Sequence, residues 1–244
     1  MNSRSRLPSP APGGRTPSSA PAAAAAGARS PAAPPRPVPR QAPSQVRIIG
    51  GRWKRTLLPV PDAQGLRPTP DRVRETLFNW LGQDLSRLAC LDLFAGSGAL
   101  GFEAASRGAA AVTLVESNAR VAKQLRDNQY RLNASQVRVV QGDAFTVAAQ
   151  FPDGSFDVVF LDPPFAEDWI GPSLEHAARL LRPGGAVYVE TDHALTGVDA
   201  PVPASLEIVR HARAGAVHFH LLQHRQHRQH RQHRPHRQHD SGAD

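Results

Sequence analysis

The residues that say most about chemistry in this chain are Asp162-Pro163-Pro164-Phe165, which directly follow the apolar run 156–161. Such a run predicts a buried strand, and open α/β sheets bind their ligands at the carboxyl ends of strands. The aspartate offers a hydrogen-bond acceptor, the two prolines stiffen the turn and remove two N–H donors, and the phenylalanine offers a flat face. This combination suits the exocyclic amino group of a nucleobase, while an ordinary Asp-Pro turn after a strand is the simpler interpretation.

A second group of candidate residues lies where the first strand of the predicted sheet meets its helix, between residues 91 and 98. Gly96 and Gly98 allow the backbone to turn tightly and to approach a ligand closely. No Gly-Lys-Ser/Thr sequence follows them, which excludes a phosphate-binding P-loop. Asp92 precedes the glycines, where it would repel a pyrophosphate and attract a cation such as the sulfonium and ammonium of S-adenosylmethionine. Phe94, between Asp92 and the glycines, is a further candidate contact.

Two more acidic residues follow the next two predicted strands. Glu116 ends the run 111–116, where a carboxylate can accept hydrogen bonds from both hydroxyls of a ribose. Asp143, with Ala144 beside it, follows the run 137–141, where an adenine amino group would be bound. The alternatives are a solvated strand end for Glu116 and a helix N-cap for Asp143, a role compatible with binding. Acids at three successive strand ends predict a site for S-adenosylmethionine, and no metal site is expected.

Apolar runs alternate with helical patterns from residue 88 onward. Strands are predicted at 88–94, 111–116, 137–141, 156–161 and 186–190, and helices at 100–106, 119–132 and 170–181. Two further strands, 206–212 and 216–222, are separated by a turn too short for a helix, so they form an antiparallel hairpin. The predicted fold is α/β, a Rossmann-like seven-stranded class I methyltransferase sheet that is mostly parallel with a C-terminal antiparallel hairpin.

Three regions are expected along the chain. Residues 1–45, rich in proline, alanine and arginine, are predicted to be disordered, as is the His-Arg-Gln repeat of residues 223–244. Residues 46–222 form the methyltransferase domain, with a hairpin and a helix in 46–85 and the catalytic core in 86–222. The helix is expected over 70–81, with Thr69 as its N-cap. No run is long or apolar enough for a membrane span or a secretion signal, so we expect a cytoplasmic protein. The protein is also expected to be a monomer.

Charge is distributed unevenly around a net value of +8. Residues 1–61 carry ten basic and no acidic side chains, whereas residues 62–222 carry fourteen basic and nineteen acidic ones. Basic flanks on an acidic body indicate a polyanionic partner. The alternative is that charged tails only keep the protein in solution.

The chain resembles the RsmD family of bacterial 16S rRNA guanine-N2 methyltransferases from about residue 46 to residue 222. The most specific match pairs Arg47-Ile48-Ile49-Gly50-Gly51 with the segment Leu66–Trp80. Both terminal extensions lie outside the usual span of the family, and the segment Trp53–Thr56 lacks a glycine that many members have. The resemblance implies methyl transfer from S-adenosylmethionine to one guanine of 16S rRNA, within the 30S subunit or its assembly intermediate.

In such an enzyme Asp162 and the carbonyl of Pro163 would accept hydrogen bonds from the reacting amine, and Phe165 would stack on the extruded base. The basic side chains near the N-terminal end of the domain are candidate phosphate contacts: Arg47, Arg52, Lys54, Arg55, Arg67, Arg72 and Arg74. The alternative is that several of them pair with Asp71 or Glu75.

Three other functions share parts of this pattern. A DNA adenine-N6 methyltransferase would need a target-recognition insertion, for which there is no room between residues 165 and 206. A protein-glutamine methyltransferase more often has asparagine at the position of Asp162. A non-catalytic RNA-binding assembly factor with the same fold need not bind S-adenosylmethionine.

Overall fold

The computed structural model describes residues 45–61, 69–164, 168–197 and 200–225. The predictions for Arg67, for Phe165 and for almost all of both terminal regions therefore lie outside the described residues. Within the described part of the chain, no helix is long and apolar enough to cross a membrane.

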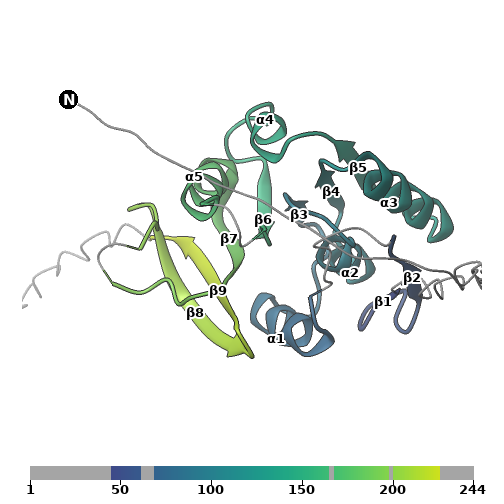
Figure 1. The fold of residues 1–244 in the computed structure, drawn as a ribbon, viewed down its shortest axis with the longest axis horizontal. Helices are drawn as coiled ribbons and strands as arrows, with labels where there is room; N and C mark the ends of the chain where they lie inside the picture. Colours follow the sequence, from purple (N-terminus) through teal and green to yellow (C-terminus); the bar gives the residue numbers. More distant parts are fainter. Residues whose placement is uncertain (1–44, 62–68, 165–167, 198–199, 226–244) are drawn as a thin grey trace, which may run out of the picture. The chain divides into compact units, whose positions relative to one another are not determined.

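A seven-stranded sheet forms the centre of the described structure (Figure 1). Its strands are β3 (Ala89–Asp92), β4 (Ala111–Glu116), β5 (Val137–Gln141), β6 (Phe156–Leu161), β7 (Leu181–Thr191), β8 (Leu206–Ala214) and β9 (Val217–His224). They lie in the order β5-β4-β3-β6-β7-β9-β8, with β3 to β7 parallel to one another and β9 antiparallel to both of its neighbours. The predicted fold class is confirmed.

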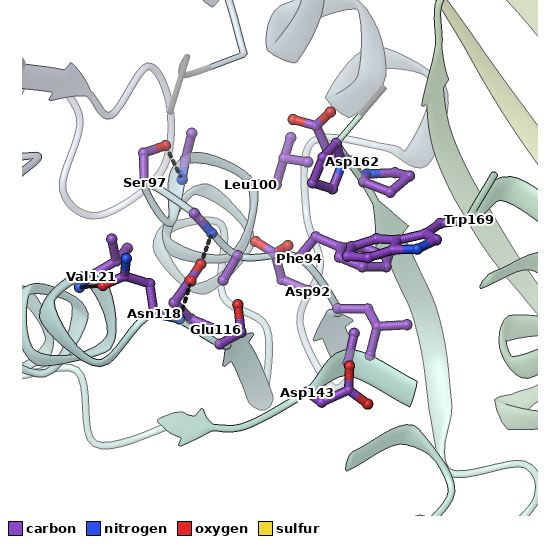
Figure 2. Close-up of a pocket in the computed structure, with 18 of the residues that line it drawn as sticks. Asp92, Phe94, Ser97, Leu100, Glu116, Asn118, Val121, Asp143, Asp162 and Trp169 are labelled. Carbon is purple, nitrogen blue, oxygen red and sulfur yellow. Dashed lines mark hydrogen bonds between the residues drawn. The ribbon is translucent and has the colours of Figure 1, made fainter. Parts of the chain in front are cut away.

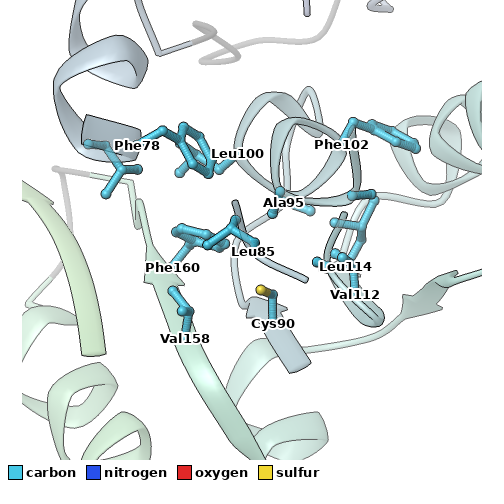
Figure 3. Close-up of a cluster of buried hydrophobic side chains, with 14 of the residues drawn as sticks. Phe78, Leu85, Cys90, Ala95, Leu100, Phe102, Val112, Leu114, Val158 and Phe160 are labelled. Atoms are coloured by element: carbon cyan, nitrogen blue, oxygen red, sulfur yellow. The ribbon is translucent and has the colours of Figure 1, made fainter. Parts of the chain in front are cut away.

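Helices cover both faces of this sheet. They are α1 (Asp71–Leu81), α2 (Ala99–Ser106), α3 (Ala119–Arg131), α4 (Ala144–Ala148) and α5 (Ile170–Leu180). One apolar cluster includes side chains of α1, α2 and α3, and a second includes those of α4 and α5. Figure 3 shows part of the first cluster, where Phe78 of α1 lies 6.2 Å from Phe160 of β6 between ring centroids, and Cys90 is a buried free thiol. Alternate residues of each central strand therefore face opposite helical layers.

Several elements differ from the sequence-based prediction. Strand β7 begins at Leu181 rather than at residue 186, and β3 ends at Asp92 rather than at residue 94. Helix α4 was not predicted, because five residues are too few to show a helical period. Helix α1 starts one residue later than expected, with Pro70 at the N-cap position and no side-chain cap. Thr69 therefore does not cap this helix, contrary to the prediction. Thr69 is instead a buried residue, 6% exposed.

The N-terminal hairpin of β1 (Gln45–Arg47) and β2 (Leu57–Pro59) forms as predicted. A buried carboxylate of α2 joins it to α1. Glu103 Oε2 accepts the backbone N–H of Ile49 at 2.8 Å and lies 3.3 Å from the guanidinium of Arg74, while Oε1 lies 2.8 Å from Arg107. Glu103 thus holds both halves of the N-terminal sequence signature against the helix that follows the glycine-rich turn.

The Gly50-Gly51 pair has a packing role in the same contact. Gly51 has φ +68°, and a Cβ there would lie 1.9 Å from the carbonyl oxygen of Ser106. The hydroxyl of Ser106 donates to the carbonyl of Gly50 at 2.6 Å. Only glycine permits this close approach of the hairpin loop to α2.

Candidate active site

Five neighbouring strands of the sheet each end at an acidic residue. In spatial order these are Asp143 after β5, Glu116 in β4, Asp92 in β3, Asp162 after β6 and Glu190 in β7. The carboxyl ends of parallel strands share one edge of a sheet, and β3 and β6 flank the point where strand order reverses. The acids therefore gather where this fold class binds its ligands.

A cavity of about 490 Å³ opens at this edge (Figure 2). Figure 2 shows Asp162 and Trp169 on one side of the cavity and Glu116 and Asn118 on the other. The predicted residues that line it are Asp92, Phe94, Gly96, Glu116, Asp143, Ala144, Asp162, Pro163 and Pro164. The predicted methyl-donor residues and the tetrapeptide around Asp162 thus surround a single space.

Asp92 is the most constrained of these acids. Its side chain is 1% exposed, Oδ2 accepts the backbone N–H of Gly101 at 3.0 Å, and Oδ1 has no hydrogen-bond partner. Burial raises the pKa of Asp92 to about 7, and the negative charges of Glu116 and Glu190 add to the increase. An unsatisfied carboxylate oxygen beside a cavity is an acceptor ready for a cationic or N–H-bearing ligand.

Glu116 and Asp143 each hold nearby backbone. Glu116 accepts the N–H of Gly96 at 3.0 Å through Oε2 and the N–H of Asn118 at 2.7 Å through Oε1. Asp143 caps α4 by accepting the N–H of Thr146 at 2.8 Å, which lowers its pKa. The capping role weighed for Asp143 is therefore confirmed. Each carboxylate oxygen has a second lone pair, so both residues keep acceptor capacity toward the cavity.

The two predicted glycines differ in their surroundings. Gly96 lines the cavity with φ +47°, so the left-handed turn brings bare backbone to the ligand space. Gly98 does not line the cavity. It has φ +76°, and a Cβ there would lie 2.6 Å from Phe102 and 2.7 Å from Leu125, so Gly98 serves helix packing.

Asp162 lines the cavity, and its carboxyl is buried although the residue as a whole keeps part of its surface exposed. Burial raises its pKa well above the usual range, and the negative charges of Glu190 and Asp92 raise it further, while the hydroxyl of Thr69 acts in the opposite direction. Burial also raises the pKa of Glu190. The acceptor predicted for the reacting amine therefore belongs to a group of neighbouring carboxyls whose negative charges repel one another.

Aromatic rings form one wall of the site. Trp169 stacks on Phe94 with 5.7 Å between ring centroids, and Phe145 meets both rings edge-on. Sequence analysis did not identify Trp169, although an aromatic residue seven positions after Asp162 was a usable signal. It also missed Thr69 and Glu190, and the position of Glu190 at the end of a predicted parallel strand was a signal for that residue.

The candidate phosphate contacts fall into two groups. Exposed side chains are found at Arg47, Arg52, Lys54, Arg55 and Arg72. Arg74 is different: it is 1% exposed and lies between Asp71, at 2.6 Å, and Glu103. The prediction of a phosphate contact by Arg74 is corrected, because a buried guanidinium with two carboxylate partners cannot reach RNA. Its partner Asp71 was one of the two acids weighed for that role.

Strand order, the terminal antiparallel hairpin and the position of the cavity together define a class I methyltransferase fold. Solved structures of two bacterial proteins are among those that share this fold. The putative methyltransferase yhhF from Escherichia coli has a TM-score of 0.65 and 43% identity, covering 74% of this chain and 98% of its own. The putative methylase HI0767 from Haemophilus influenzae has a TM-score of 0.62 and 36% identity over 74% and 99%.

Residues 46–223 match the family model described as Conserved hypothetical protein 95. Ribosomal RNA small subunit methyltransferase D of Escherichia coli is 45% identical over 186 residues, which are 74% of this chain and 90% of that protein. The protein of the same name from Haemophilus influenzae is 43% identical over 190 residues, with 74% and 94% covered. This chain belongs to that family, the RsmD family.

Proposed function

We propose that this protein transfers the methyl group of S-adenosylmethionine to the exocyclic N2 of a guanine in 16S rRNA. One observation supports the proposal most strongly: Asp162, Pro163 and Pro164 line the same cavity as Asp92 and Glu116. An acceptor for a planar amine and acceptors for a methyl donor therefore share one space. The names of the relatives supply the substrate class, small-subunit rRNA.

The residues of the cavity fit S-adenosylmethionine. The free Oδ1 of Asp92 would accept from the ammonium group, Glu116 would accept from the ribose hydroxyls, and Asp143 would accept from the adenine amino group. The apolar wall of Phe94 and Trp169 suits a flat heterocycle, and the cavity volume is in the range of small-molecule sites. When bound, the cofactor supplies a methyl group on an electron-poor sulfur.

The reacting amine needs positioning more than it needs a strong base. Its lone pair is delocalised into the base, so acceptors on its N–H groups favour a pyramidal nitrogen whose lone pair can attack. Asp162 and the carbonyl of Pro163 would provide these acceptors. No N–H competes from either proline. Positioning of this kind supplies a large part of many enzymatic rate enhancements.

RNA would be held outside the cavity by exposed basic side chains. Arg47, Arg52, Lys54 and Arg55 lie in or beside the β1–β2 hairpin. Arg72 lies on the first turn of α1, three residues after the cavity residue Thr69. Phosphate contacts of this kind fix the position of a nucleic acid without reading its sequence. The target base would then be extruded into the cavity.

Methyl transfer can be tested with 30S subunits and naked 16S rRNA from a strain that lacks this activity. We expect labelled methyl from S-adenosylmethionine to enter one guanine, identified by mass mapping. Asp162→Ala should abolish transfer while S-adenosylmethionine affinity, measured by calorimetry, changes little. The matched control Glu207→Ala, at an exposed position of β8, should retain full activity.

Each rival function has its own outcome in this experiment. Methylation of adenine in duplex DNA would indicate the DNA enzyme, and methylation of a glutamine side chain would indicate the protein methyltransferase. Absence of S-adenosylmethionine binding would indicate a non-catalytic assembly factor. Near-normal transfer by Asp162→Ala would remove that residue from the proposed role.

A further inference from the structure

Glu190 occupies the position next to Asp162 on the neighbouring strand. Strands β6 and β7 are parallel, with Phe160 opposite Tyr188 and Leu161 opposite Val189. The next residues are Asp162, directly after the end of β6, and Glu190, within β7. Because side chains alternate between faces, these two carboxyls project from the same face of the sheet, side by side.

The surroundings of Glu190 leave it little access to solvent. Its side chain is 3% exposed, and across the other edge of β7 its partner is Phe219 of β9. The hydroxyl of Tyr188 donates to Glu190 Oε1 at 2.9 Å. Glu190 does not line the cavity, whereas Asp162 does. Among the residues that the structure describes, no basic side chain forms an ion pair with either carboxyl.

We propose that Asp162 and Glu190 act as one proton-sharing pair, in which Glu190 is a positioning residue for the reacting amine. Two buried carboxyls on adjacent strands, without a basic partner, cannot both ionise at low cost. The pair therefore keeps one proton and one negative charge in the free protein. The shared proton links the two side chains and directs the remaining acceptor oxygens of Asp162 into the cavity.

The groups that face the pair agree with this inference. Asp92 of β3 adds negative charge and opposes a second ionisation, and Glu190 in turn raises the pKa of Asp92. Tyr188 and the hydroxyl of Thr69 act in the other direction, because each stabilises an ionised carboxylate by hydrogen bonding. Such a pair titrates in two steps that belong to both residues together.

A pair of this kind gives the proton of the amine a place to go. This consequence rests on the proposed function. As the nitrogen lone pair forms the N–C bond, the C–S bond breaks with its electrons remaining on sulfur, and the nitrogen becomes positively charged. One N–H proton then passes to Asp162, so the pair becomes doubly protonated and neutral, and it returns a proton to solvent through the cavity.

Titration of the ligand-free protein tests the pair without any reaction. Carbon-13 NMR of labelled carboxyl groups should show Asp162 and Glu190 each responding in two steps, one of them above the usual range. Glu190→Gln should lower the titration point of Asp162 by about one pH unit or more, because the negative neighbour is removed. Tyr188→Phe should move it upward, because the ionised pair loses a donor. The exposed controls Glu207→Gln and Tyr130→Phe should leave it unchanged.

Enzyme kinetics provide a second readout. The acid limb of the kcat profile should move to lower pH in Glu190→Gln and to higher pH in Tyr188→Phe, whereas a merely structural role would lower kcat without moving the limb. Independent single-step titration of the two carboxyls, or a Tyr188→Phe shift in the same direction as Glu190→Gln, would overturn the pair. Paired titration without methyl transfer to rRNA would instead refute the proposed function and leave the pair intact.

Discussion

Asp92→Asn should make the ligand-free protein more stable at alkaline pH while weakening its binding of the methyl donor. Asp92 is buried, one of its oxygens has no partner, and its pKa is raised from 3.8 to about 7. The folded state therefore binds the proton of Asp92 more tightly than the unfolded state does. Stability that is present below pH 4 is lost as the pH rises to about 7.

The size of this effect follows from the shift of the pKa. An increase from 3.8 to about 7 corresponds to about 4 kcal/mol of lost stability once the group is ionised in both states. Asparagine carries no charge, and its carbonyl can keep the hydrogen bond from Gly101. Its amide would place N–H donors where Oδ1 now has no partner, at a cost of about 1–3 kcal/mol. The expected net gain at pH 8 is therefore about 1–3 kcal/mol.

The assay is urea unfolding of both proteins without ligand between pH 4 and pH 8.5. The variant should be the less stable protein at pH 4 and the more stable one at pH 8, so the two stability curves cross. Asp92→Asn also removes a negative charge that raises the pKa of Asp162, so Asp162 contributes a smaller change in the same direction to the difference between the two curves. Asp92→Ala is the matched control: it also removes the charge, but it leaves the Gly101 N–H without an acceptor and opens a void, so it should gain less or nothing.

A difference between variant and wild type that does not change with pH would refute this account of Asp92. Calorimetry completes the test. Loss of one charge-assisted hydrogen bond should weaken S-adenosylmethionine binding by about 10-fold to 150-fold. A stabilised variant with undiminished affinity would mean that the unsatisfied oxygen serves no ligand. The expected combination, higher stability with lower affinity, is typical of residues retained for function at a cost in stability.

Three further predictions concern the N-terminal part of the domain. Glu103→Gln leaves Arg107 without its buried counter-charge and should lower the free energy of unfolding by about 3–5 kcal/mol, measured in urea. Gly51→Ala should cost about 3 kcal/mol or more because its Cβ meets backbone, whereas Gly215→Ala, also at positive φ but in open space, should cost about 1–2 kcal/mol. The double substitution Arg52→Ala with Lys54→Ala should reduce the slope of log affinity for rRNA against log salt by about 1.4, and an unchanged slope would exclude these residues from the RNA contact.

The strands and their order could be predicted because buried parallel strands leave plain apolar runs. The bounds of β4, β5 and β6 were predicted to the residue, and those of α3 and α5 to within one residue at the C-terminal end. Helix α4 escaped prediction because it is shorter than two turns and depends on the cap that Asp143 provides. The role of Arg74 also required the structure, since only packing against α2 shows that an arginine two residues from Arg72 is buried.

The residues of the candidate site could likewise be predicted only in part from the sequence. Spacing after each strand identified Asp92, Glu116, Asp143 and Asp162, because each directly ends or follows an apolar run. The pairing of Asp162 with Glu190 depends on register, which places these residues side by side only if Leu161 lies opposite Val189. A shift of one residue in that register would turn Glu190 to the opposite face of the sheet.

Strand order also separates the roles of the five acids. Glu116 and Asp143 lie on one side of β3, Asp162 and Glu190 lie on the other, and Asp92 lies between them, at the edge of the point where strand order reverses. Acids on the first side accept hydrogen bonds from backbone N–H groups and would face a ligand with many donors. Acids on the second side are buried beside each other without a basic partner among the described residues, so under the proposal they share a proton, which suits them to an amine that gives one up. Because Asp92 raises the pKa of Asp162 across this boundary, a cation bound to Asp92 should make the pair easier to ionise. Binding of the methyl donor would thereby prepare the acceptor for its amine.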